Sequence, residues 1–219
     1  VQYLQYLFLC DWNFCSEESL QPARKFFPAP GSLPEAGNKI VQIAASGPDS
    51  DTPAILYSIL QAINLATREI LISTPYFIPG EILVESLVIA SLSGISVKLL
   101  VPGKSDSRLV NSAARSYYRH LIEKGIEIYE YKKGFMHAKT MVADRKIAIV
   151  GTANMDGRSF DFNFEVNAIV YDEAIAGQLA DIFFEDLEDA VKIDLAAWSN
   201  RPKYIRLIEK TARLVSPLL

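Results

Sequence analysis

Two side chains that could act together on a phosphate group lie two residues apart, His137 and Lys139. The apolar run beginning there predicts a β-strand, in which residues i and i+2 point to the same face, roughly 7 Å apart along it. A lysine ammonium offsets the anionic oxygens that repel a nucleophile, and an imidazole supplies either an attacking nitrogen or a proton. The pair therefore predicts a site for attack on a phosphodiester.

Residues that could complete such a site follow soon after this pair. The turn Gly151-Thr152-Ala153-Asn154 consists of small residues, so we expect its backbone N–H groups to approach an anion closely. Thr152 is a candidate phosphate-binding residue, and Asn154 can donate a hydrogen bond to a phosphoryl oxygen. Glu165 begins another strand and is the expected partner of the second ring nitrogen of His137, where it would hold tautomer and orientation.

This segment resembles a known signature. The residues HAKTMVAD at 137–144 resemble the HxKxxxxD motif of the phospholipase D superfamily, and GTANMD follows where that family has its small-residue turn and asparagine. The likeness to the C-terminal lobe of bacterial cardiolipin synthases extends over nearly the whole chain. Its further stretches are FLCDW at 8–12, STPYFIP at 73–79, RSFDFNFEV at 158–166 and ARLVSPLL at 212–219.

The resemblance implies roles for the residues that match the motif. His137, Lys139 and Asn154 would bind phosphate and carry catalysis, Glu165 would orient His137, and Asp144 would be mainly structural, without a metal or other cofactor. The implied reaction moves a phosphatidyl group between two phosphatidylglycerol molecules through a phosphohistidine, giving cardiolipin. A bacterial cell membrane is the expected location, with the site facing the cytoplasm and the parent chain anchored upstream.

One motif copy is present, whereas synthases of this kind carry two and form their site where two lobes meet. Whether His137 is the nucleophile or the general acid therefore stays open. The partner would be the N-terminal lobe of a longer chain or a second copy in a homodimer. Two alternatives also remain: a phosphodiesterase, either phospholipase or nuclease, working as a single-motif dimer, and a phosphate- or lipid-binding lobe that is inactive without its partner lobe.

Composition and motif spacing argue against several other classes. The formal net charge is −4 and the sequence pI is about 5.3, whereas domains that grip nucleic acid through phosphates are usually basic, so no nucleic-acid partner is expected. The sequence has two histidines, His120 and His137, too few for a histidine-rich metal site. Gly103-Lys104-Ser105 is not a phosphate loop, because that motif requires glycine where Lys98 stands.

The elements that must position these residues alternate between strand and helix. We expect a remnant of a preceding lobe at 1–20, beginning with a strand at 1–9, then a proline-rich linker at 21–38 and a catalytic lobe at 39–219. The alternation predicts an α/β fold, a mixed β-sheet flanked by helices on both faces. Expected strands are 40–44, 70–74, 96–101, 126–131, 139–143, 147–150 and 165–171, and expected helices are 51–67, 81–93, 108–124, 173–191 and 202–215.

Two further features have more than one interpretation. Tyr76 and Phe77 follow a strand end, where open sheets of this type bind ligands, so they could contact substrate or merely pack the loop between Pro75 and Pro79. The last expected helix carries one basic stripe and one apolar stripe, which could dock on the domain or lie on an anionic membrane surface. The stripes are Lys203, Arg206, Lys210 and Arg213, and Ile205, Ile208, Ala212 and Val215.

Overall fold

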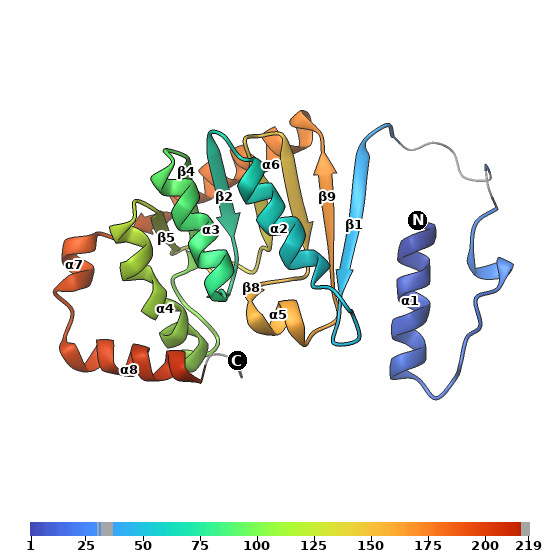
Figure 1. The fold of residues 1–219 in the computed structure, drawn as a ribbon, viewed down its shortest axis with the longest axis horizontal. Helices are drawn as coiled ribbons and strands as arrows, with labels where there is room; N and C mark the ends of the chain where they lie inside the picture. The colour runs from blue at the N-terminus through green and yellow to red at the C-terminus, as the bar shows by residue number, and fades with distance from the viewer. Residues whose placement is uncertain (30, 32–36, 216–219) are drawn as a thin grey trace.

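The computed structural model of the chain describes residues 1–29, 31 and 37–215. Its centre is an eight-stranded sheet of order β1-β9-β7-β6-β2-β4-β5-β10 (Figure 1). β2, β4 and β5 are parallel neighbours and the remaining pairs are antiparallel. The strands are β1 (Ile40–Ser46), β2 (Glu69–Ser73), β4 (Ser96–Pro102), β5 (Glu127–Tyr131), β6 (Thr140–Ala143), β7 (Ile147–Gly151), β9 (Glu165–Tyr171) and β10 (Ala190–Lys192).

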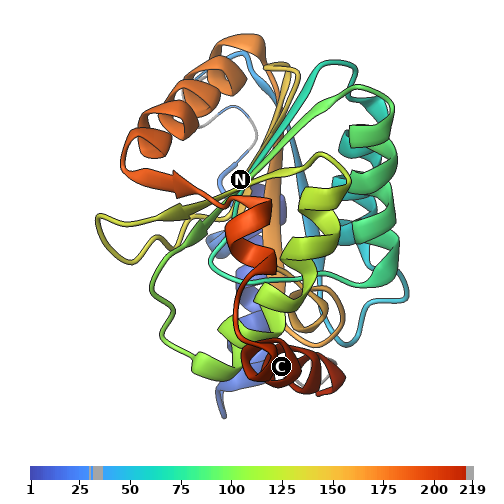
Figure 2. The ribbon, with the colours of Figure 1, turned by 90° about the vertical axis from the view of Figure 1, so that its left-hand side faces the viewer.

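Helices cover both faces of this sheet, which confirms the predicted fold class. Figure 2 shows α6 on one face, with α2, α3 and α4 on the other. The helices α7 and α8 pack against α4. The helices are α1 (Gln2–Cys15), α2 (Ala54–Leu65), α3 (Glu81–Leu92), α4 (Arg108–Glu123), α5 (Gly157–Asp161), α6 (Glu173–Glu188), α7 (Leu195–Ser199) and α8 (Lys203–Leu214), with a 3₁₀ turn at Arg24–Phe26.

Alternation along the central strands divides the core into two layers. In β2, Ile70 and Ile72 join the cluster under α2, α3 and α4, whereas Leu71 joins the cluster under α6. The same alternation separates Leu99 from Leu100 in β4. Because successive side chains of a strand point to opposite faces, an unbroken apolar run is buried on both sides. These strands therefore form the rigid support of the molecule.

Local signals fix several of the helix ends. The Ser107 hydroxyl caps α4 and the Asp172 carboxylate caps α6, and Gly94 and Gly125 follow α3 and α4 with positive φ. The start of α2 differs from expectation. No side chain of 51–53 caps it, and the Ser46 hydroxyl, at the end of β1, accepts a hydrogen bond from Ile55 N at 3.0 Å.

The prediction of a strand at 1–9 is wrong, because this segment forms α1. A helix satisfies its own backbone hydrogen bonds, whereas a strand needs a neighbour, and no described strand pairs with these residues. Leu9 is buried, and Phe14 contacts Phe164 with ring centroids 5.3 Å apart, so α1 lies against the β1–β9 side of the molecule (Figure 1). Within the expected linker, residues 30 and 32–36 lie outside the described residues.

The helix expected over 173–191 ends at Glu188, and the chain then forms β10 beside β5. Asp189 accepts a hydrogen bond from Lys132 N, which begins this pairing. Four short elements had no periodic pattern to reveal them: α5, α7, and the two-residue strands β3 (Phe77–Ile78) and β8 (Met155–Asp156), which pair with each other. Residues 216–219 of the expected family-like terminus lie outside the described part.

Candidate active site

His137 and Lys139 lie side by side, as the spacing predicts. Lys139 Nζ is 3.1 Å from His137 Nδ1 and 3.2 Å from the backbone oxygen of the same residue. The two residues are not within a strand, because β6 begins one position later, at Thr140. The imidazole is exposed and the lysine is half-buried. A cation and a nucleophilic ring nitrogen therefore meet at an accessible edge of the sheet.

Two aromatic rings hold the imidazole of His137. Phe135 stacks on it, with centroids 5.4 Å apart and an interplanar angle of 30°, and Tyr76 meets it edge to face at 6.3 Å. The Tyr76 hydroxyl in turn donates to the carboxylate of Asp106 at 2.7 Å. Burial, followed by this carboxylate, raises the pKa of Tyr76 to about 12, so the phenol stays protonated. Tyr76 therefore lies at the site, and Phe135 is a contact that the sequence reading missed.

The antiparallel strands bring the other candidates to the same edge. Gly151, at the end of β7, donates its backbone N–H to the Lys139 oxygen at 3.2 Å, and β7 pairs Gly151 with Asn167 of β9. A Cβ at Gly151 would collide with Asn167 and with the Val166 carbonyl, so glycine permits this close approach. The segment after β7 and the start of β9 thus meet beside Lys139.

The turn after β7 does not form the anion cradle that its composition predicts. Its N–H groups already have acceptors inside the protein: Thr152 donates to Val166 O, Ala153 to the Asn167 side chain and Asn154 to the Ser159 hydroxyl. The Thr152 hydroxyl accepts from Val166 N at 2.9 Å. Thr152 therefore ties β7 to β9, and its predicted phosphate contact is not supported by this geometry.

Within the part of the chain that the structure describes, the group of Asn154 that remains unpaired is its side-chain oxygen, which suits a hydrogen-bond donor of a ligand. Its Oδ1 is buried without a hydrogen-bond partner among the described residues, which is unusual for a buried amide. It lines a cavity of about 310 Å³ together with Tyr76, Asp156, Arg158 and three other residues. Asp156 is buried and caps α5, and burial raises its pKa. Of the groups lining the cavity, the Arg158 guanidinium is suited to a phosphate, whereas the Tyr76 hydroxyl already donates to Asp106 and the Asn154 oxygen accepts hydrogen bonds.

Glu165 lies at this edge, but the structure contradicts its expected contact. Its carboxylate accepts a hydrogen bond from Asn163 Nδ2 at 3.2 Å, and no hydrogen bond joins it to His137. Its charge acts on Lys139 instead. Burial lowers the pKa of Lys139, while the carboxylates of Glu165 and Asp156 oppose that shift. Glu165 therefore supports the lysine in this conformation rather than the imidazole.

Asp144 lies at the opposite end of β6 from His137. Its carboxylate accepts hydrogen bonds from the N–H groups of Thr67, Arg68 and Glu69 and from the Thr67 hydroxyl, at 2.7–2.9 Å. Asp144 is thus an anchor between β6 and the start of β2, with no contact to the candidate site. Its pKa lies below the ordinary value, because these bonds outweigh the opposing effect of burial.

Phe77 is not a substrate-binding residue in this structure. It is 1% exposed, belongs to β3 and packs in the main core, so only Tyr76 of the two aromatic residues reaches the site. The sequence signal that favoured both was their position after β2, which is correct for the loop as a whole. Among the described residues, no group of three or more His, Cys, Asp or Glu could hold a metal, and no helix could span a membrane.

Comparison with known families shows which family the chain belongs to. A family described as "Cardiolipin synthase, PLD-like domain" matches residues 59–187, more than half of the chain. The chain belongs to this family. The matched span contains His137, Lys139 and Asn154 and all strands of the sheet except β1 and β10.

Curated members of the family match along the whole chain. Cardiolipin synthase of Clostridium perfringens strain SM101 is 43% identical over 99% of the chain, and that of Geobacillus thermodenitrificans is 42% identical over 100%. The matches cover 46% and 43% of those two proteins, so the chain spans less than half of their length.

Solved structures agree on the fold alone. A phosphatidylserine synthase from Haemophilus influenzae superimposes with a TM-score of 0.65 at 15% identity, covering 82% of this chain and 48% of that one. Nuc, a phospholipase D family member from Salmonella typhimurium, superimposes with a TM-score of 0.61 at 18% identity, covering 71% and 99%. The architecture is therefore that of the phospholipase D fold.

Proposed function

We propose that this chain is one lobe of a phosphatidyltransferase that makes cardiolipin from two phosphatidylglycerol molecules. The observation that carries the proposal is the 3.1 Å approach of Lys139 Nζ to His137 Nδ1 at an accessible sheet edge. Identity of 42–43% to curated cardiolipin synthases along the chain supports this choice of reaction among phosphodiester chemistries. The cavity beside the pair, lined by Asn154 and Arg158, supports a phosphate-containing substrate.

The proposed reaction uses two histidines in turn. A nitrogen of the first attacks phosphorus in one phosphatidylglycerol, the bond from phosphorus to the glycerol headgroup oxygen breaks, and the second histidine protonates that oxygen. The free hydroxyl of a second phosphatidylglycerol then gives its proton to the second histidine and attacks phosphorus. This step forms the new phosphodiester and releases the first histidine.

Each side chain of this half-site has a task in that scheme. His137 is one of the two histidines. Lys139 neutralises a nonbridging phosphoryl oxygen as charge develops there, and the Asn154 amide hydrogen-bonds another. Glu165 favours the charged form of the lysine, because its carboxylate opposes the lowering of the Lys139 pKa by burial. Asp144 contributes only through the anchor that holds β6.

The second histidine would come from outside this chain copy. The N-terminal lobe of a longer chain is the favoured source, because the chain spans less than half of the curated synthases. A symmetric homodimer is the other source. In either arrangement we propose that the site works on the cytoplasmic face of a bacterial membrane, where its lipid substrate is found.

Replacing His137 with alanine in the longer parent protein tests the proposal. We expect cardiolipin formation from labelled phosphatidylglycerol, and release of glycerol, to fall at least about a thousandfold, because the histidine forms or cleaves a bond in each step. His120→Ala is the matched control, since His120 is the other histidine and is exposed on α4. Retained synthesis in the His137 variant would refute its assignment.

Light scattering with an activity assay on the same chromatographic peak tests the isolated chain. An active dimer supports a site built from two copies of His137, and an inactive monomer supports a half-site that needs the other lobe. Single-stranded DNA is the competing substrate. Cleavage of DNA without turnover of anionic lipid would replace the proposed reaction with that of a nuclease.

A further inference from the structure

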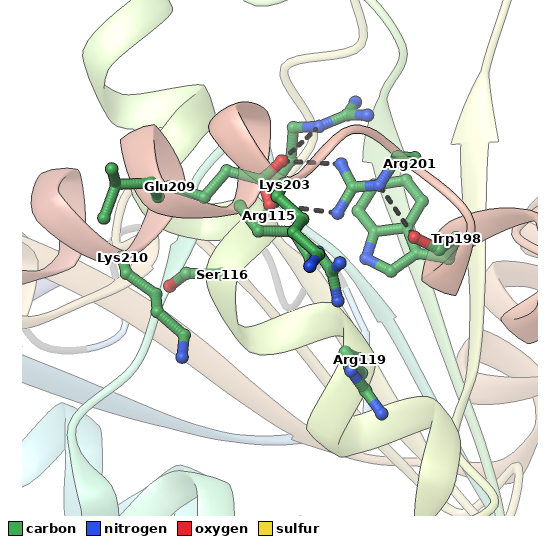
Figure 3. Close-up of a pocket in the computed structure, with 10 residues that line it drawn as sticks. Arg115, Ser116, Arg119, Trp198, Arg201, Lys203, Glu209 and Lys210 are labelled. Atoms are coloured by element: carbon green, nitrogen blue, oxygen red, sulfur yellow. Dashed lines mark hydrogen bonds and ion pairs between the residues drawn. The ribbon is translucent and has the colours of Figure 1, made fainter.

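A second cavity, of about 410 Å³, lies between α4, α7 and α8 (Figure 3). It shares no lining residue with the cavity at Tyr76, and its size is that of a small-ligand site. Six cations and one carboxylate line it, although the chain as a whole carries a net charge of −4. This cavity is called the basic pocket below, and its cations are Arg115, Arg119, Arg201, Lys203, Arg206 and Lys210.

The floor of the basic pocket is a neutralised ion-pair network. Glu209 is 4% exposed and receives two hydrogen bonds from Arg201, at 2.6 and 2.9 Å, and one from Arg115 at 3.3 Å. Arg115 also pairs with Glu130 at 3.0 Å. Two guanidinium groups therefore share two carboxylates, with Lys132 also paired to Glu130, and this network holds α8 against α4.

The charge that remains comes from α8. Lys203, Arg206 and Lys210 make no ion pair with any described residue, and their spacing puts them on one side of the helix. Arg119 pairs with Glu123 only at the surface, where such a pair contributes little. Like charges gathered on one face repel one another unless a counter-charge is present. The rim of the pocket is therefore suited to an anion.

Trp198 adds an unused hydrogen-bond donor. Its ring is 7% exposed, and the guanidinium groups of Arg201 and Arg115 lie 3.4 and 4.4 Å from its centroid. Its indole Nε1 has no partner among the described residues, although a buried indole N–H usually finds one. Figure 3 shows this nitrogen on the side of the ring that faces the basic side chains. An anionic oxygen entering between those side chains would supply the missing acceptor.

We propose that the basic pocket binds the phosphate of an anionic lipid headgroup and docks the protein on the membrane surface, separately from the site at His137. The rest of α8 favours a lipid over other phosphate carriers, because Tyr204, Leu207, Ile208 and Leu214 are exposed beside the cations. Cations next to exposed apolar side chains on one helix are typical of a helix lying at a membrane interface. The proposal rests on the proposed function in one respect, which is that the protein acts at a lipid membrane.

The apolar stripe predicted for α8 divides into residues buried against the domain and residues exposed to solvent. Ala212 is buried against the domain and Ile205 is half-buried, but Ile208 and Val215 are exposed. Glu209, which belongs to neither stripe, is instead buried and pairs with Arg115 of α4 and with Arg201 in the segment between α7 and α8. The helix therefore docks through its ion-pair network and leaves apolar groups free for a lipid.

Sedimentation with vesicles tests the docking. Vesicles of phosphatidylglycerol in phosphatidylcholine should bind the protein, and those of pure phosphatidylcholine should not. The triple variant Lys203→Gln, Arg206→Gln and Lys210→Gln should weaken binding about a hundredfold, because each basic side chain near an anionic surface contributes about fivefold. The matched control changes three exposed lysines elsewhere and loses the same charge, through Lys25→Gln, Lys124→Gln and Lys146→Gln.

The control variant should bind anionic vesicles nearly as the unchanged protein does. Equal weakening in both variants would overturn the pocket, because it would reduce the effect to net charge. His137→Ala should leave vesicle binding unchanged. Loss of synthesis with retained vesicle binding therefore separates this proposal from the proposed reaction.

The indole N–H of Trp198 provides a direct signal for the pocket. The chain has two tryptophans, so a nitrogen-15 NMR spectrum shows two indole signals that Trp12→Phe assigns. Short-chain phosphatidylglycerol below its micelle concentration should shift the Trp198 signal and spare that of Trp12. Inorganic phosphate shifting it equally would identify a free-phosphate site, and tighter binding of single-stranded DNA would identify a nucleic-acid site. Either result would overturn a lipid site.

Discussion

Replacing Asp144 with alanine separates an anchoring role from a catalytic one. Its carboxylate accepts four hydrogen bonds, from the backbone N–H groups of Thr67, Arg68 and Glu69 and from the Thr67 hydroxyl. It also has φ of 55°, in the left-handed region that aspartate and asparagine tolerate better than alanine. The substitution therefore removes a cap and adds backbone strain, far from His137.

The magnitude follows from these contacts. Four bonds to a charged acceptor at about 1.5 kcal/mol each would give about 6 kcal/mol, and water can recover about half of that because Thr67 and Arg68 are exposed. Left-handed strain of alanine adds about 1 kcal/mol. We expect Asp144→Ala to lower the free energy of unfolding by about 4 kcal/mol. Asp144→Gly, which lacks the strain, should lose about 3 kcal/mol.

Urea unfolding followed by circular dichroism measures this loss of free energy of unfolding. Asp144→Asn should lose about half as much as Asp144→Ala, because the amide oxygen still accepts hydrogen bonds. Activity of the folded fraction in the parent protein should stay within a few fold of the unchanged enzyme. An Asp144→Ala variant with an unaltered unfolding midpoint, or a fully folded one without synthesis, would refute the anchoring role.

Three further predictions concern other parts of the molecule. Burial would raise the pKa of Glu127, but hydrogen bonds from Lys192, Lys98 and Tyr129 outweigh it and lower this pKa to about 2. The free energy of unfolding of the unchanged protein should therefore exceed that of Glu127→Gln by its full amount above about pH 4.5. This difference should decline as the pH falls toward about 2, and urea titrations at several pH values measure it. Gly151→Ala should lower the unfolding free energy by about 1–3 kcal/mol, measured by the same titration, because its Cβ meets β9. Phe135→Leu should reduce synthesis about fivefold without changing the thermal midpoint, because the ring stacks on His137 from an exposed position.

The sequence predicts the main elements well because each has a strong periodic or capping signal. β9 coincides with its expected range, 165–171, α3 and α4 differ from theirs by one residue at one end, and α8 differs by one residue at each end. These segments carry apolar patterns, and α3 and α4 are followed by glycine, so local chemistry decides most of their bounds. The segment 1–9 fails for the opposite reason. Apolar composition alone does not separate strand from helix, and the availability of a partner strand decides.

The candidate site was predictable where the interaction is local and not where it depends on the fold. His137 and Lys139 are two residues apart, so their contact follows from chain geometry. Glu165 and Asn163 are also two apart, yet their bond displaces a predicted long-range contact with His137. Sequence cannot rank two such partners, because the choice depends on how the start of β9 meets the turn after β7. The occupied N–H groups of that turn are hidden from sequence for the same reason.

Phe135 was within reach of sequence reasoning, since an aromatic residue two positions before His137 shares its side of an extended segment. The basic pocket was less accessible. It needs Arg115 of α4 to meet Trp198 of α7 and Glu209 of α8, three residues far apart in the chain. Only the basic and apolar stripes of α8 were visible beforehand, and the apolar stripe contains the buried Ala212 but not the buried Glu209.

The antiparallel half of the sheet affects how the candidate site forms during folding and how its residues could move from one lobe to a related one. The four residues predicted to be catalytic all come from one continuous stretch, 137–165, which enters the sheet through β6, β7 and β9. The pairing of β6 with β7 across a short turn costs little chain entropy, whereas β2 and β4 pair only after a helical crossover. The stretch is thus a continuous unit of three antiparallel strands that pairs, through β6, with the first of the parallel strands β2, β4 and β5. Transferring it between two related lobes would carry these four residues, while Tyr76 and Phe135, which contact His137, would come from the receiving lobe.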